Sequence, residues 1–325
     1  MLDAAWFREP ARPAGGDEAA PSDLDDLRAL LACPACRGEL EWEPERIRCS
    51  ACAAEYELRD GIPVLRPPAP DENRHKEQQE SFFDAADAEF EVTRPHGTPW
   101  FYRWVLAEKF RRSLASLDLP RGAAALTVCG GSGMDAEFLA RAGFRVLASD
   151  LSFEAVRRAQ ERGVRHGLPI LAVVADAEAL PFRDRTVDLV YVHDGLHHLE
   201  TPEPGLREML RVSREAVSIN EPAHAQATLL ATRVRLAEHY EEAGNFIARL
   251  DPDRLATRVG AAGFEIVRSE RYAMVYRHVP GRLARLLSVP GLRLATQAVH
   301  GAFNAVAGRL GNKLTLQAVR RDQPL

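Results

Sequence analysis

Lysine is almost absent from this chain of 325 residues, which contains only Lys76, Lys109 and Lys313. Arginine supplies the other basic residues and alanine is abundant, a bias that we attribute to GC-rich coding DNA rather than to function. The chain also lacks a basic excess, because its formal net charge is −5. That balance argues against a broadly basic nucleic-acid binder, although it leaves room for a local basic patch.

Long hydrophobic runs are missing as well. No apolar stretch approaches the roughly 20 residues that a membrane-spanning helix needs. The N-terminus lacks the basic and then apolar order of a secretory signal peptide. Hydrophobic residues make up 46% of the chain and charged residues 27%, as in soluble globular proteins. We therefore expect a cytoplasmic protein with no transmembrane segment.

Cysteine is rare, but four of the five cysteines form two Cys-x-x-Cys pairs, Cys33 with Cys36 and Cys49 with Cys52. Each pair can present two thiolates from a tight turn, which suits one tetrahedral Zn²⁺ in a closed, structural site. A module this small has too little core to fold alone, so the metal would supply much of its folding energy. Disulfide bonds, or cysteines that pack as small apolar groups, are the alternative and fit a cytoplasmic protein less well.

The composition changes along the chain and predicts four parts. Residues 1–24 are rich in Ala, Pro, Gly and Asp without an apolar period, which favours disorder. The cysteine module covers 25–66, and residues 67–122 form a linker followed by helices. Residues 123–325 alternate apolar strands with helices, and within them 273–312 form a basic, amphipathic helical insertion.

The alternation beyond residue 123 is the βαβ pattern of an α/β protein with a mostly parallel sheet. The expected strands cover residues 124–129, 145–150, 170–175, 187–193, 216–221, 264–272 and 313–320.

A glycine turn, Cys129-Gly130-Gly131-Ser-Gly133, follows the first of these strands. Glycines let the backbone approach a ligand closely, and the N-terminus of the next helix offers unpaired N–H groups. Asp150 ends the second strand, where a carboxylate can accept hydrogen bonds from ribose hydroxyls. This spacing fits a nucleoside-bearing cofactor, NAD included.

A second acid, Asp176, follows the third strand and precedes Ala177. The carboxyl edge of an open α/β sheet is where ligands bind. There the Asp176 carboxylate can accept from the exocyclic amine of an adenine ring, and the Ala177 N–H can donate to the ring.

From about residue 75 to 321 the chain resembles the class I S-adenosylmethionine-dependent methyltransferases of the methyltransferase type 11 kind. The matching motifs are the glycine turn, Asp150 in Asp-Leu-Ser, Asp176-Ala177 before Leu-Pro-Phe182, and Leu196-His-His-Leu199. The resemblance implies a Rossmann-like seven-stranded sheet with an antiparallel last hairpin, S-adenosylmethionine as cofactor and methyltransferase activity.

The resemblance also implies the role of each cofactor-binding residue. Gly131 and Gly133 would pass under the amino-acid part of the cofactor, and Cys129 and Gly130 of the same turn are also expected to contact the cofactor. Asp150 would hold the ribose, Leu151 would pack on adenine, Asp176 and Ala177 would read the adenine edge, and His193 would line the methionine side. Two positions depart from the family pattern, which usually has an acid at Thr127 and a glycine at Cys129. Thr127 predicts either a weaker contact to the ammonium end of the cofactor or a contact made by another residue, and Cys129 adds a side chain where close backbone approach is usual. Because Gly130, Gly131 and Gly133 are present, we expect the cofactor to bind.

The cysteine module resembles the zinc-ribbon family of methyltransferase activator subunits. The motifs are Cys33-Pro-Ala-Cys36-Arg-Gly-Glu-Leu40, the second cysteine pair, Tyr56 and Asp60-Gly-Ile-Pro-Val-Leu65. Fusion to the methyltransferase-like part implies a module that stabilises it or positions its substrate.

Candidate catalytic residues lie at the expected carboxyl ends of the fourth and fifth strands: His193, Asp194, His197 and Glu221. Methyl transfer is a displacement in which orientation and desolvation supply much of the rate, so a base is needed only when the acceptor starts protonated. For each of these residues a structural role is the alternative. The aromatic segment Phe82-Phe83-Asp84 predicts either a lid over the cofactor or packing on the sheet.

The acceptor is not encoded in these motifs. We expect a small molecule, a glycan or a lipid-linked precursor, and the alternatives are an rRNA or tRNA base methyltransferase and a non-catalytic partner protein that binds the cofactor. The insertion 273–312 has three interpretations: an apolar face packed on the sheet with arginines in water, a pocket wall for an anionic or lipid-linked acceptor, or peripheral contact with a membrane surface.

Overall fold

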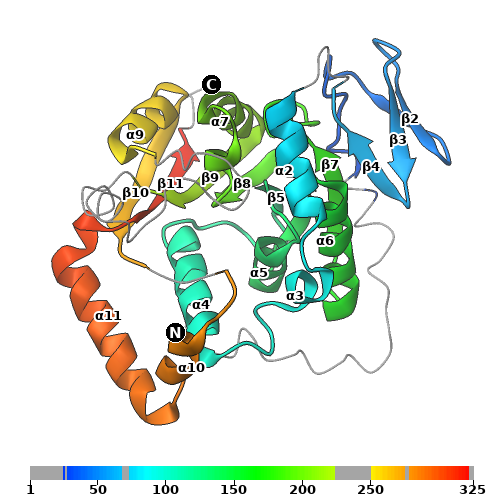
Figure 1. Ribbon diagram of the computed structural model, residues 1–325. Coiled ribbons are helices and arrows are strands. Elements are labelled where there is room, and N and C mark those ends of the chain that lie inside the picture. The colour runs from blue at the N-terminus through cyan, green and yellow to red at the C-terminus, as the bar shows by residue number, and fades with distance from the viewer. Residues whose placement is uncertain (1–24, 26–27, 68–72, 224–249, 275–277, 322–325) are drawn as a thin grey trace.

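The computed structural model describes residues 25, 28–67, 73–223, 250–274 and 278–321 (Figure 1). The tail 1–24, for which the sequence predicts disorder, lies outside the described residues. Eleven strands form one mixed sheet in the order β1-β2-β3-β4-β7-β6-β5-β8-β9-β11-β10. Helices cover both faces of its central part (Figure 1).

The first four strands form an antiparallel meander that carries the cysteines. They are β1 (Leu40–Trp42), β2 (Arg46–Cys49), β3 (Glu55–Arg59) and β4 (Ile62–Leu65). Strand β1 pairs antiparallel with β2, β2 with β3, and β3 with β4.

The other seven strands agree closely with the ranges that the sequence predicts. They are β5 (Ala124–Val128), β6 (Arg145–Asp150), β7 (Ile170–Ala175), β8 (Val187–His193), β9 (Ser213–Pro222), β10 (Phe264–Tyr272) and β11 (Lys313–Arg320). The strands β5 to β9 run parallel, and β11 lies antiparallel to both β9 and β10. The predicted antiparallel last hairpin is therefore present.

The predicted count of seven strands needs correction, because the sheet does not stop at β7. Strand β4 pairs parallel with β7 through Val64 opposite Val174 and Leu65 opposite Ala175. Without β4, the N–H and C=O groups along that side of β7 would be an open sheet edge. The cysteine-bearing strands thus extend the central sheet to eleven strands.

Two apolar layers flank the central strands. On one face, α7 (Pro202–Val212) and α9 (Pro252–Ala261) share a core with the inner residues of the cysteine module. On the other face lie α4 (Trp100–Leu114), α5 (Met134–Ala142) and α6 (Phe153–His166). Along β5 the side chains alternate between the layers, Ala125 in the second and Leu126 in the first.

The remaining helices lie outside this sandwich. They are α2 (Arg74–Asp84) and α3 (Ala88–Thr93) before α4, the single turn η2 (Leu196–His198) after β8, and α10 (Arg282–Leu287), η3 (Pro290–Leu292), α11 (Arg293–Ala307) and η4 (Gly308–Leu310) between β10 and β11. In the part of the chain that is described, no helix is both long and apolar enough to cross a membrane.

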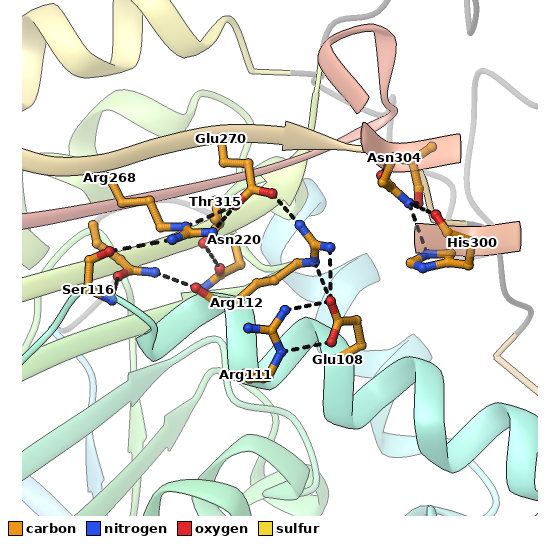
Figure 2. A network of polar contacts seen from close by, with 12 residues as sticks. Glu108, Arg111, Arg112, Ser116, Asn220, Arg268, Glu270, His300, Asn304 and Thr315 are labelled. Carbon is orange, nitrogen blue, oxygen red and sulfur yellow. Dashed lines mark hydrogen bonds and ion pairs between the residues drawn. The ribbon is translucent and has the colours of Figure 1, made fainter. Parts of the chain in front are cut away.

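A polar network fastens α4 to the hairpin of β10 and β11 (Figure 2). The Arg112 guanidinium forms ion pairs with Glu108 on its own helix and with Glu270 on β10. Glu270 also pairs with Arg268. Nearby, Gln317 on β11 accepts a hydrogen bond from the Ser116 N–H at 2.7 Å. These contacts hold the last hairpin against the helix layer.

A buried ion pair joins α5 to α6. Arg162 and Glu137 are fully buried and lie 2.7 Å apart. Glu137 also binds His96 at 2.7 Å. Burial alone would raise the pKa of Glu137, but the hydrogen bond from His96 and the charge of Arg162 lower it well below its usual value.

We predict that Arg162→Leu destabilises the protein by about 3–5 kcal/mol, because it leaves a buried carboxylate with fewer partners. The measurement is the free energy of unfolding in urea. Arg157→Leu on the same helix is the control, since Arg157 pairs with Glu154 at a partly exposed site and should cost less than about 1 kcal/mol. Equal losses in the two variants would contradict the assigned role of Arg162.

Candidate functional site

A cavity of about 900 Å³ opens at the carboxyl ends of β5, β6, β7 and β8. Its lining includes the glycine turn, the residues that follow β6 and β7, and the start of the turn after β8. Helix α2 and residues 85–94 complete it from the opposite side. The cavity therefore brings together the motifs that the sequence spreads over residues 129 to 198.

The glycine turn adopts backbone conformations that a β-carbon would disturb. Gly131 has φ +51° and Gly133 has φ +77°. A β-carbon on Gly133 would lie 2.7 Å from that of Ala159 on α6, and one on Gly130 would lie 2.5 Å from Thr127 Oγ1. These glycines keep the turn tight against the sheet and leave its backbone N–H groups near the cavity.

Cys129 and Thr127 are the two positions that depart from the family pattern. Cys129 has φ +51°, a conformation in which glycine is more usual. Its side chain fits because Gly195 lies opposite, where a β-carbon would come within 2.6 Å of the Cys129 β-carbon. Burial raises the pKa of the Cys129 thiol. Thr127 is buried, and its hydroxyl has no hydrogen-bond partner among the described residues.

Asp150 joins the glycine turn to the end of β6. Its carboxylate accepts hydrogen bonds from the Gly131 N–H at 2.9 Å and from the Ser152 N–H at 3.0 Å. Burial raises the pKa of Asp150 above its usual value, although these N–H groups oppose the rise. Leu151, next in the chain, also lines the cavity.

Asp176 and Ala177 follow β7 and line the same cavity. Lys76 on α2 binds the Asp176 carboxylate at 2.6 Å and Glu178 at 2.5 Å. Burial alone would lower the pKa of Lys76, but these hydrogen bonds raise it. The ion pairs fasten α2 across the cavity.

Further contacts hold α2 in place. At its C-terminal end, Asp84 accepts a hydrogen bond from Ser152 Oγ at 2.5 Å. Near its start, His75 Nε2 lies 2.7 Å from the His198 carbonyl oxygen. Residues 82 and 83 line the cavity, and their role as a lid stays a prediction.

His193 is the last residue of β8, and Asp194 begins the turn that follows it. His193 Nδ1 lies 3.0 Å from Asp135 Oδ1, and its Nε2 lies 3.5 Å from Asp194. Asp194 binds Lys109 at 2.8 Å and Lys313 at 2.6 Å. Burial alone would raise the pKa of Asp194, but the two ammonium groups hold it well below its usual value.

His197 and Glu221 lie behind that turn. His197 Nδ1 lies 2.7 Å from Glu221 Oε2, and both side chains are buried. The other oxygen, Glu221 Oε1, accepts from the Gly195 N–H at 2.9 Å and the Leu196 N–H at 2.7 Å. His197 reaches the cavity lining and Glu221 does not.

The site also contains lysines that the sequence motifs do not predict. All three lysines of the chain bind carboxylates here, Lys76 beside Asp176 and Lys109 with Lys313 beside Asp194. The scarcity of lysine was the available signal in the sequence, but it does not predict that three residues far apart in the chain lie at one site.

The four paired cysteines meet at the base of the cysteine module. Their sulfur atoms all lie within 4.8 Å of one another. The distances are 3.7 Å between the sulfurs of Cys33 and Cys52 and 3.4 Å between those of Cys36 and Cys49. Zn–S bonds of about 2.3 Å in a tetrahedron place sulfurs about 3.8 Å apart, so the cluster fits the metal.

Comparisons with known proteins agree with the site. A methyltransferase domain family model matches residues 126–218. Demethylmenaquinone methyltransferase of Thermobifida fusca is 35% identical over 103 residues, which cover 31% of this chain and 44% of that protein. The ubiquinone/menaquinone biosynthesis C-methyltransferase UbiE of Pseudoalteromonas translucida is 26% identical over 181 residues, 48% of this chain and 71% of that protein.

The chain spans about half the length of the demethylmenaquinone methyltransferases that it matches. Among solved structures, the [4+2]-cyclase SpnF superposes with a TM-score of 0.52 at 20% identity, over 82% of this chain and 100% of that one. At that identity the likeness shows the fold alone. The family match and the relatives identify residues 126–218 as a class I S-adenosylmethionine-dependent methyltransferase domain.

Proposed function

We propose that this protein transfers a methyl group from S-adenosylmethionine to a small-molecule acceptor. The observation that carries the proposal is one cavity lined by the glycine turn, Asp150, Leu151, Asp176 and Ala177. The family resemblance assigns each of them a contact to the cofactor. The division into a cysteine module, lid helices and a catalytic domain, and the cytoplasmic location, stay part of this proposal.

The cofactor fits the residues present. Gly131 lines the cavity and has open space around it for the amino-acid part, and Asp150 offers a carboxylate to the ribose hydroxyls. Gly133 faces Ala159 and does not itself line the cavity. Asp176 keeps acceptor capacity for the adenine amine beside its bonds to Lys76 and the Glu178 N–H, since each carboxylate oxygen has two lone pairs. When bound, the cofactor supplies an electrophilic methyl group on a sulfonium.

His193 is the base that the geometry favours. If its Nδ1–H donates to Asp135, its Nε2 lone pair is left to accept a proton from the acceptor. Asp194 is a poor base near neutral pH because Lys109 and Lys313 hold it ionised. Their ion pairs with Asp194 hold in place the residue that follows His193. Both oxygens of Glu221 are engaged within the fold, which favours a structural role for Glu221 and for His197.

The relatives suggest the acceptor class to test first. Because they are named for demethylmenaquinone and ubiquinone/menaquinone biosynthesis, we propose a lipid-soluble quinone in its reduced form, whose electron-rich ring offers carbon or oxygen to the methyl group. The assay is methyl transfer from labelled S-adenosylmethionine to reduced demethylmenaquinone. Transfer to total tRNA instead would favour the RNA alternative.

We predict that Asp150→Ala weakens binding of S-adenosylhomocysteine about ten- to hundredfold, the effect of losing hydrogen bonds to a charged group. Isothermal titration calorimetry measures it. The control is Asp118→Ala, since Asp118 is exposed and does not line the cavity. Unchanged affinity in Asp150→Ala would contradict the assigned cofactor site.

We predict that His193→Gln lowers kcat about a hundredfold or more and weakens binding of S-adenosylhomocysteine by a much smaller factor, because a general base acts on the chemical step whereas His193 only lines the methionine side of the cavity. The matched variant His197→Gln should lower the melting temperature, since it breaks a buried pair with Glu221. A larger kcat loss in His197→Gln than in His193→Gln would reverse the assignment.

We also propose a structural Zn²⁺ on Cys33, Cys36, Cys49 and Cys52. The purified protein should contain about one zinc ion per chain by elemental analysis. Cys49→Ser should lose the metal and lower the melting temperature, because the module shares its core with the central sheet. Cys129→Ser is the control and should keep the metal. Zinc retained in Cys49→Ser would argue against the site.

A further inference from the structure

Helix α11 turns its polar stripe toward the protein. Asn304 Oδ1 accepts from the Ala273 N–H at 2.8 Å, and the Asn304 amide donates to the Ala273 carbonyl at 3.2 Å. One turn earlier, the His300 ring packs edge-on against Trp104 at 5.0 Å between centroids. His300 and Asn304 lie next to each other on this helix in Figure 2.

The opposite side of α11 is apolar and faces solvent. Leu294 is 80% exposed, Val299 69%, Phe303 55% and Val306 89%. Helix α10 and its neighbouring turns add further exposed residues, and ten of the thirteen large apolar residues exposed in the described chain fall between 279 and 310. This contradicts the interpretation in which the apolar face of the insertion packs on the sheet. Apolar patches of this kind mark an interaction surface.

The charges of the insertion select the partner. Residues 278–312 contain Arg282, Arg285, Arg293 and Arg309 and no acidic residue, although the whole chain has a net charge of −5. A second copy of the chain docked face to face would bring like charges together. Anionic lipid headgroups complement the arginines, and acyl chains accept the apolar side chains.

The insertion also borders the cavity. His278 and Val279, at its start, belong to the cavity lining. The Tyr102 hydroxyl donates to the His278 carbonyl at 2.9 Å, and Ser288 Oγ accepts from the Phe101 N–H at 2.9 Å. Both contacts anchor the insertion to α4, so a surface bound there would lie beside the cavity mouth. Figure 1 shows α10 next to α4, with α11 along the outer edge of the molecule.

We propose that residues 278–312 dock the protein on the surface of an anionic lipid bilayer. The Leu294 to Val306 face would enter the acyl boundary and the arginines would contact headgroups. This position would let a lipid-soluble acceptor reach the cavity directly from the membrane, a consequence that rests on the proposed function, whereas the docking does not.

The test is cosedimentation of the whole protein with vesicles. Vesicles of equal parts phosphatidylglycerol and phosphatidylcholine should bind it at low salt, and pure phosphatidylcholine or high salt should weaken binding. The variant Leu294→Glu/Val299→Glu/Val306→Glu should bind at least about tenfold more weakly. Arg282→Gln/Arg285→Gln should lose about fivefold for each arginine. Val164→Glu is the matched control, because Val164 is 80% exposed on α6, and should bind like the original protein.

Three results would overturn the proposal. The first is no binding to anionic vesicles at low salt, and the second is equal binding by the triple variant and Val164→Glu. The third is a dimer in analytical ultracentrifugation that the triple variant abolishes while vesicles bind neither protein, which would assign the face to a second copy. Calorimetry with S-adenosylhomocysteine separates this failure from failure of the proposed function, since the triple variant should retain cofactor affinity.

Discussion

The parallel pairing of β4 with β7 is the contact on which the rest of the arrangement depends. Two residue pairs, Val64 with Val174 and Leu65 with Ala175, join the cysteine-bearing strands to the central sheet. The chain leaves β4 at Leu65 and enters α2 at Arg74, so the same pairing fixes where α2 begins. The cysteine cluster holds the strands that supply β4. A metal ion bound there would affect the cofactor cavity indirectly, by fixing the position of these strands and their packing on the central sheet.

The cavity itself is organised by ion pairs between elements that are far apart in the chain. Lys76 on α2 binds Asp176, and Lys109 on α4 and Lys313 on β11 both bind Asp194. Since α4 and β11 also meet through the network around Arg112 and Gln317 (Figure 2), the last hairpin positions a lysine at the site. The hairpin of β10 and β11 therefore contributes directly to the cavity, and the insertion between these two strands is attached to it.

Much of the fold was predictable because the signals are local. Short apolar segments bounded by turn residues predicted strands such as 145–150, 170–175 and 264–272 with the bounds that the structure has. The cofactor motifs at Gly131, Asp150 and Asp176 were predictable for the same reason, as parallel strands bring their carboxyl ends to one edge. The number of strands in the sheet was not predictable, because the pairing of β4 with β7 produces no periodic pattern in the sequence.

The sequence by itself determined the α/β class, the cysteine cluster, the order of the strands along the chain and the residues that meet at the carboxyl edge. Only the tertiary structure decided which partners those residues have. Asp194 forms ion pairs with two lysines, Glu221 accepts hydrogen bonds from the turn after β8, and the Cys129 side chain fits in the space beside Gly195. The tertiary structure also turned the apolar side of α11 outward. The helical period of the sequence predicts that one face of the helix is apolar and the other polar. Which of the two packs on the protein depends on contacts such as those of Asn304 with Ala273, which lie more than thirty residues apart in the chain.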